Sequence, residues 1–225
     1  MALHETTTIQ LKDGAIMRNS ILVLTALVAM AHPVAAQELV ISGVVDGPLT
    51  GGTPKAVEIY VVSDVADLSV FGVGSANNGG GSDGEEFTFP AVAATAGEFI
   101  YVATEAVAFN DFFGFTPDYI SGSAASINGD DAIELFRNGA VTDVFGDINV
   151  DGTGQAWDYL DGWAYRVSGT GPDGSTFALA NWTFSSPNAL DGETSNGTAA
   201  APFPIGTFST TAAEPELIIN EVDAD

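Results

Sequence analysis

The chain has 225 residues, of which 30 are acidic and five basic, and its formal net charge is −25. Because 46% of the residues are hydrophobic, the acidity does not predict disorder, and the chain can bury a core. A surface this acidic repels nucleic acid and anionic lipid and attracts divalent cations, so direct binding to nucleic acid is not expected.

The first elements in chain order concern export. Residues 1–16 are polar, and we interpret them as upstream of the true start. Residues 17–36 contain a positive residue, a short apolar run and then small residues, which predicts a secretory signal peptide cleaved before Gln37. The apolar run is too short to span a bilayer of about 30 Å, and no Cys follows it as in a lipoprotein. We therefore expect a secreted, extracellular bacterial protein with no membrane span after signal removal.

The exported part lacks the residues of most catalytic sites. His4 and His32 both precede the predicted cleavage site, and the chain has no Cys. This excludes a Ser-His-Asp or Cys-His arrangement, a His-Cys zinc site and a disulfide. Lys55, Arg137 and Arg166 are the only basic side chains that remain, and no pair among the many carboxylates can be singled out as acid and base. We predict no catalytic and no organic cofactor-binding residues, and a chain that is not an enzyme.

The exported part reads as short strands between clusters of Gly, Asn, Asp and Ser, which is typical of an all-β sandwich or barrel. The expected strands cover residues 39–45, 56–62, 68–73, 86–89, 98–103, 132–136, 141–145, 164–167 and 177–184. Asn138-Gly139 predicts a type I′ hairpin turn, because both residues accept a positive φ. Residues 109–115 predict one short helical turn, and residues 77–84 predict a flexible loop tip.

Aromatic residues surround Asp161-Gly162 and suggest a hairpin with rings on both faces. The residues concerned are Trp157, Tyr159, Trp163 and Tyr165. Exposed rings would stack on sugars, whereas buried rings would be core, and we favour core. Arg137 and Arg166 are expected to pair with acids or to stack on aromatic rings. Glu58, Glu134 and Asp143 are expected to be partners or outward-facing residues rather than catalysts.

Residues 147–158 match the spacing of a calcium-binding loop, with oxygen side chains at positions 1, 3 and 5 and Gly at position 6. The expected metal ligands are the side chains of Asp147, Asn149, Asp151 and Asp158 and the backbone carbonyl of Thr153. Position 12 is Asp rather than the usual Glu, and the flanks read as strands rather than helices. The alternative is a polar turn, and the strongly negative charge of the chain favours Ca²⁺.

The end of the chain repeats the first exported strand. Residues 217–223 share three aliphatic residues, a small polar residue, Val and an acid with residues 39–46, and residues 209–216 read as a linker. Residues 217–225 are therefore expected to begin a second repeat in a longer tandem protein. The alternative is an ordinary last strand that closes the first domain.

Several ordered motifs in residues 37–208 resemble a bacterial lamin tail domain. The matching stretches are Ala56-Val57-Glu58-Ile59-Tyr60, Gly129-Asp130-Asp131-Ala132-Ile133-Glu134-Leu135-Phe136, Asn138-Gly139, Val141-Thr142-Asp143, Tyr165-Arg166, Asn181-Trp182-Thr183 and Pro187-Asn188. Gly43 departs from the Glu usual in the family, and residues 77–84 and 147–161 look like insertions. The resemblance implies an immunoglobulin-like β-sandwich of the kind found beside secreted nucleases, phosphatases and adhesins.

Two functions follow as expectations. The first is a secreted, non-catalytic module that binds or spaces a protein or glycan partner at a surface and is stabilised by calcium. The second is an N-terminal accessory domain of a secreted nuclease or phosphatase whose catalytic domain lies beyond Asp225. Function does not follow from fold, so the sequence leaves both open.

Overall fold

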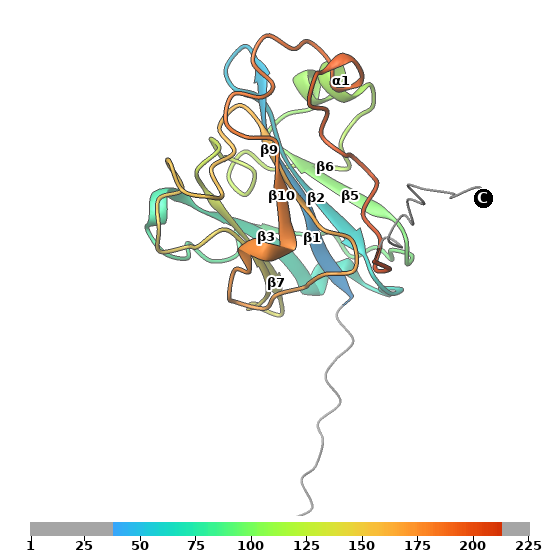
Figure 1. Cartoon of the computed structure of the whole chain (residues 1–225). Coiled ribbons are helices and arrows are strands. Elements are labelled where there is room, and N and C mark those ends of the chain that lie inside the picture. The colour runs from blue at the N-terminus through green and yellow to red at the C-terminus, as the bar shows by residue number, and fades with distance from the viewer. Residues whose placement is uncertain (1–37, 213–225) are drawn as a thin grey trace, which may run out of the picture. The chain divides into compact units, whose positions relative to one another are not determined.

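The computed structural model describes residues 38–212. The predicted start region 1–16, signal peptide 17–36 and second repeat 217–225 lie outside the described residues, as does the linker from residue 213 onward. The described part forms ten strands in two sheets with one α-helix, which confirms the predicted all-β sandwich (Figure 1). No helix within it is long and apolar enough to cross a membrane.

One sheet has six strands in the order β10-β9-β1-β2-β5-β6, and the other has four in the order β4-β3-β7-β8. The six-stranded sheet contains β1 (Leu39–Leu49), β2 (Thr53–Val61), β5 (Phe99–Ala103), β6 (Tyr119–Ile120), β9 (Trp163–Arg166) and β10 (Trp182–Phe184). The four-stranded sheet contains β3 (Phe71–Ala76), β4 (Phe87–Thr88), β7 (Ala132–Arg137) and β8 (Ala140–Phe145). Neighbouring strands are antiparallel except β5 and β6, which are parallel.

The main core lies between the two sheets. Ile41 and Ile59 of the six-stranded sheet and Val73 and Leu135 of the four-stranded sheet belong to one buried cluster. Aromatic rings close one part of it: the Phe145 ring lies edge-on to those of Trp157, Tyr159, Phe177 and Trp182. Trp157 and Tyr159 are buried here, and in a second cluster Tyr165 is buried and Trp163 is partly buried, so the core interpretation of the aromatics around Asp161-Gly162 is confirmed.

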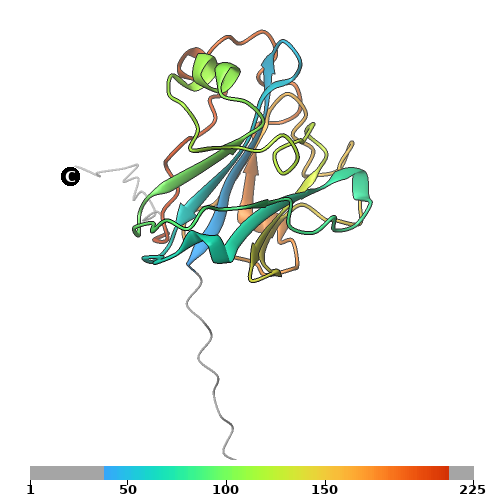
Figure 2. The ribbon, with the colours of Figure 1, turned by 180° about the vertical axis from the view of Figure 1, so that it is seen from behind.

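A third layer covers the outer face of the six-stranded sheet. Helix α1 (Val107–Phe113) and the C-terminal segment 199–208 bury a second cluster that includes Phe112, Phe203 and Phe208. Both views show the red C-terminal segment running beside this sheet, close to α1 (Figures 1 and 2). As a result, Leu39 to Gly47 of β1 are all buried, which explains why β1 reads as a continuous apolar run rather than an alternating one.

Three local predictions were wrong. Residues 68–70 form a 3₁₀ turn (Leu68–Val70) before β3, because the Asp67 side chain caps it by accepting from Ser69 N at 2.9 Å. Most of residues 177–184 is also not strand: a 3₁₀ turn (Leu179–Asn181) leaves only three residues to β10. Residues 157–162 form turns rather than a hairpin arm, because Tyr159 N donates to Gly129 O at 2.7 Å.

The predicted hairpin turn is confirmed; the predicted loop at residues 77–84 is present, and its flexibility stays a prediction. Asn138 and Gly139 between β7 and β8 have φ of 50° and 76°, as a type I′ turn requires. Residues 77–84 begin with a 3₁₀ turn (Asn77–Gly79); farther along, Ser82 Oγ donates to Glu134 on β7 and the Gly84 backbone lies against Gly74 on β3. Gly74 permits this contact, because a Cβ there would meet the Gly84 carbonyl oxygen at 2.1 Å.

Candidate functional site

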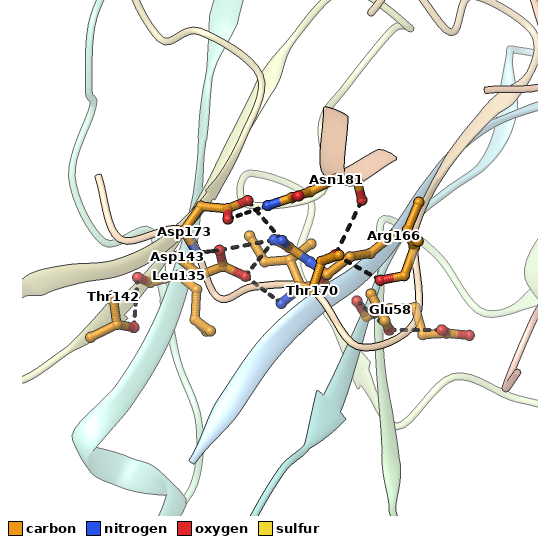
Figure 3. A network of polar contacts seen from close by, with 11 residues as sticks. Glu58, Leu135, Thr142, Asp143, Arg166, Thr170, Asp173 and Asn181 are labelled. Carbon is orange, nitrogen blue, oxygen red and sulfur yellow. Dashed lines mark hydrogen bonds and ion pairs between the residues drawn. The ribbon is translucent and has the colours of Figure 1, made fainter. Parts of the chain in front are cut away.

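A buried polar network in the described residues centres on Arg166, their largest fully buried side chain (Figure 3). β9 pairs with β1 only from Gly43 to Val45, and β1 has a register shift just before Gly43. At Ile41, where β1 is no longer paired with β9, the Arg166 side chain binds β1 instead: its Nε donates to the Ile41 carbonyl at 2.6 Å.

Asp143 on β8 brings the other sheet into the network. Arg166 Nη2 donates to both Asp143 oxygens at 2.9 and 2.8 Å, and Ile41 N donates to Asp143 Oδ2 at 2.8 Å. Both side chains of this ion pair are 0% exposed. The carboxylate and the guanidinium together satisfy the backbone of Ile41, so the pair holds β1, β8 and β9 to one another.

The loop after β9 completes the enclosure. Arg166 Nη1 donates to Asp173 Oδ2 at 2.8 Å, and Asn181 Nδ2 donates to Asp173 Oδ1 at 2.6 Å. The guanidinium carbon lies 4.4 Å from the centre of the Trp182 ring. Burial raises the pKa of the Asp143 carboxyl to about 6, although Arg166 opposes the shift. The acid is therefore perturbed, but it is enclosed on every side by protein groups and does not face a cleft.

A second buried carboxylate, Glu58 on β2, holds the C-terminal segment to the outer face of the six-stranded sheet. Its Oε1 accepts from Ser42 Oγ at 2.7 Å and Tyr165 OH at 2.8 Å, and its Oε2 accepts from Gly206 N at 2.7 Å. Tyr165 OH in turn accepts from the backbone N–H groups of Thr207 and Phe208 at 3.0 and 2.9 Å. Burial raises the pKa of the Glu58 carboxyl.

The basic side chains of the described residues are all engaged in ion pairs. Lys55 Nζ lies 2.7 Å from the buried Asp46, and Arg137 Nε lies 2.9 Å from Glu38. Arg137 also lies over the Phe71 ring at 5.5 Å. The predictions for Arg137 and Arg166 are confirmed, since each pairs with an acid and stacks on an aromatic ring. The remaining acidic groups on the described surface are left without a basic side chain.

The predicted metal ligands lie in the connection from β8 to β9, where each carboxylate caps its own turn. Asp147 Oδ1 accepts from Asn149 N at 3.0 Å, and Asp151 Oδ1 accepts from Thr153 N at 2.9 Å. Asp158 Oδ2 accepts from Gly154 N at 2.7 Å. Within residues 38–212 no three Asp, Glu, His or Cys side chains form a group that could hold a metal ion. Calcium binding by this loop stays a prediction.

The adjacent residues Asp130 and Asp131 together join this connection to two other loops, which the sequence did not predict. Asp131 makes the contacts with those two loops. Its carboxylate is buried and accepts from Asn78 N at 2.8 Å and Asn128 N at 3.0 Å. Its neighbour Asp130 accepts from Thr153 Oγ1 at 2.7 Å. The adjacent acids Asp130-Asp131 after a Gly were visible in the sequence, but nothing local shows that they gather loops far apart in the chain.

Two shallow grooves open on the described surface. The first, of about 340 Å³, lies between Val40, Val62, Phe208 and residues 169–172. The second, of about 330 Å³, lies where β5 begins, and Glu98 and Asp118 are among the residues that line it. Neither groove contains Asp143 or Glu58, so the buried acids of raised pKa and the surface grooves are separate features.

The geometry defines an all-β sandwich of two sheets with a third layer over one of them. Comparison with known proteins found no matching family model, no matching curated protein and no matching solved structure. The resemblance to lamin tail domains therefore rests on the sequence motifs alone.

Proposed function

We propose that the chain is a secreted, non-catalytic module of lamin-tail type that binds or spaces a protein or glycan partner at a surface. The observation that carries the proposal is the placement of its ionisable groups. Asp143 and Glu58 are each held by at least three hydrogen bonds inside the protein, away from both grooves. Groups fixed and enclosed in this way stabilise a fold, whereas a general acid or base must reach a substrate.

The surface charge supports binding rather than spacing alone. The acidic side chains that remain outside the ion pairs leave the described surface strongly negative, and such a field attracts cationic partners and Ca²⁺. Calcium would be a stabilising ion here, held by the turn at residues 147–158. The same field disfavours nucleic acid as a direct ligand.

The test measures attachment and turnover in parallel. Labelled residues 37–225 are incubated with the cells that secrete the protein, before and after treatment of the cells with protease or periodate. Saturable attachment that one treatment removes supports the module and tells a protein partner from a glycan. Hydrolysis of DNA, RNA or a phosphoester by the purified chain, abolished by one Asp or Glu substitution, would refute it.

The accessory-domain alternative differs from the first function in what the gene encodes after the strand repeat at residues 217–223. Sequencing the gene beyond Asp225 separates the two functions. A downstream domain rich in His and Asp favours an accessory role beside a hydrolase, and further β-repeats favour a free-standing array.

A further inference from the structure

The groove where β5 begins has an apolar floor and one apolar wall. We call it the β5 groove and define it by Leu68, Val92, Ala94, Glu98, Ile100 and Asp118. Leu68, Ala94 and Ile100 form the buried floor, and Val92 on the wall is 46% exposed. An aliphatic chain laid in this groove would cover Val92 and remove apolar surface from water.

Two exposed acidic residues, Glu98 and Asp118, line the same groove, and hydrogen bonds from backbone N–H groups hold both carboxylates in place. Glu98 Oε2 accepts from Thr95 N at 2.8 Å, and Asp118 Oδ2 accepts from Tyr101 N at 2.8 Å. Each bond uses one oxygen, and no hydrogen bond within residues 38–212 reaches the other. The groove thus presents two positioned acceptors for a donor from outside.

No basic side chain of the described chain is free to neutralise these acids. Lys55, Arg137 and Arg166 are each ion-paired elsewhere. A second copy of this chain is a poor occupant, because it carries the same excess of acid and would be repelled. The complementary group is an aliphatic stem that ends in a cation, which among side chains means lysine or arginine.

We propose that the β5 groove binds a lysine or arginine side chain from an extended basic segment of a partner protein. The stem lies against Val92 and the apolar floor, and the cation binds Glu98 and Asp118. This inference rests on the proposed function and names the chemistry of the partner. Because the inference concerns only the β5 groove, an experiment can refute it without refuting the proposal that the chain is a binding module.

The probe is the pentapeptide acetyl-Ala-Lys-Leu-Lys-Ala-amide, titrated into ¹⁵N-labelled residues 37–225 and followed by NMR. We expect saturable shifts centred on residues 92–100 and 118–119. The double variant Glu98→Gln/Asp118→Asn keeps both hydrogen-bond acceptors, and it should weaken binding roughly tenfold, since each exposed ion pair contributes modestly. Val92→Ser should also weaken binding, because it removes the apolar wall.

Asp83→Asn/Asp111→Asn is the matched control, because it removes two exposed charges outside the groove. We expect this control to change the dissociation constant less than twofold. Shifts spread over the whole acidic surface, or equal losses in the two double variants, would mean general attraction and overturn the proposal. Equal binding of acetyl-Ala-Glu-Leu-Glu-Ala-amide would mean an apolar groove without cation recognition and would overturn it as well. If cells retain a chain that binds no peptide, the groove proposal fails and the proposed function does not.

Discussion

Arg166→Met tests whether the buried ion pair holds the two sheets together. Methionine fills a similar volume, but it leaves Ile41 O without the Nε donor at 2.6 Å and Asp143 without its counter-ion. Removal of one partner from a buried pair costs about 3–5 kcal/mol, so we expect a loss of about that size in the free energy of unfolding at pH 8.

The loss should depend on pH, because Asp143 can escape its unpaired state by taking up a proton. Its pKa is about 6 in the folded protein against an ordinary value of 3.8, and removal of Arg166 raises it further. At pH 5 the carboxyl of the variant is therefore neutral in the folded state. We expect the variant to lose at least about 1 kcal/mol less at pH 5 than at pH 8.

Urea unfolding followed by tryptophan fluorescence measures both losses, and Trp182 lies against the guanidinium in the native state. The double variant Arg166→Met/Asp143→Asn is the control, because an amide cannot take up the proton. Its free energy of unfolding should lack the pH dependence that the Asp143 carboxyl gives to Arg166→Met. A loss below about 1 kcal/mol at both pH values, or one that is equal at pH 5 and pH 8, would refute this account of the network.

Three further predictions concern pH, the C-terminal segment and calcium. Burial raises the pKa of Asp143 and of Glu58, so each carboxyl binds a proton more tightly in the folded state. The free energy of unfolding should therefore rise as the pH falls from 7 to 5. A decrease in the free energy of unfolding over that pH range, measured by urea titration, would contradict the assignment. Tyr165→Phe removes the hydroxyl that binds Glu58 and the N–H groups of Thr207 and Phe208. The free energy of unfolding should drop by about 2–3 kcal/mol, and thermolysin should cleave within residues 203–208 sooner. Unchanged cleavage would show that apolar contacts alone hold the C-terminal segment. If residues 147–158 bind calcium, a 100-fold excess over the dissociation constant should stabilise the fold by about 2.7 kcal/mol, and thermal melts of Asp151→Ala should no longer distinguish calcium from chelator. Identical melts of the unsubstituted protein in calcium and in chelator would leave the loop as a polar turn.

Several features could be predicted because their causes are local. Short apolar stretches between turn residues predicted an all-β sandwich or barrel, and Asn138-Gly139 predicted its own turn because both residues tolerate a positive φ. The pairing of Arg137 and Arg166 could be predicted too, since a cation so rare in an acidic chain finds an acid wherever it is buried.

Other features depend on contacts between distant parts of the chain, and only the tertiary structure decided them. Glu58 was predicted to be a partner or an outward residue, and it is a partner. The identity of its partners could not be predicted, because the C-terminal segment covers that face of β2 and Glu58 accepts from Gly206 N, 148 residues later. Asp143 and Arg166 bind the Ile41 backbone across 102 and 125 residues. Strand periodicity reports which residues share a face, but it does not report what covers that face, because the covering layer comes from chain too far away to leave a local pattern.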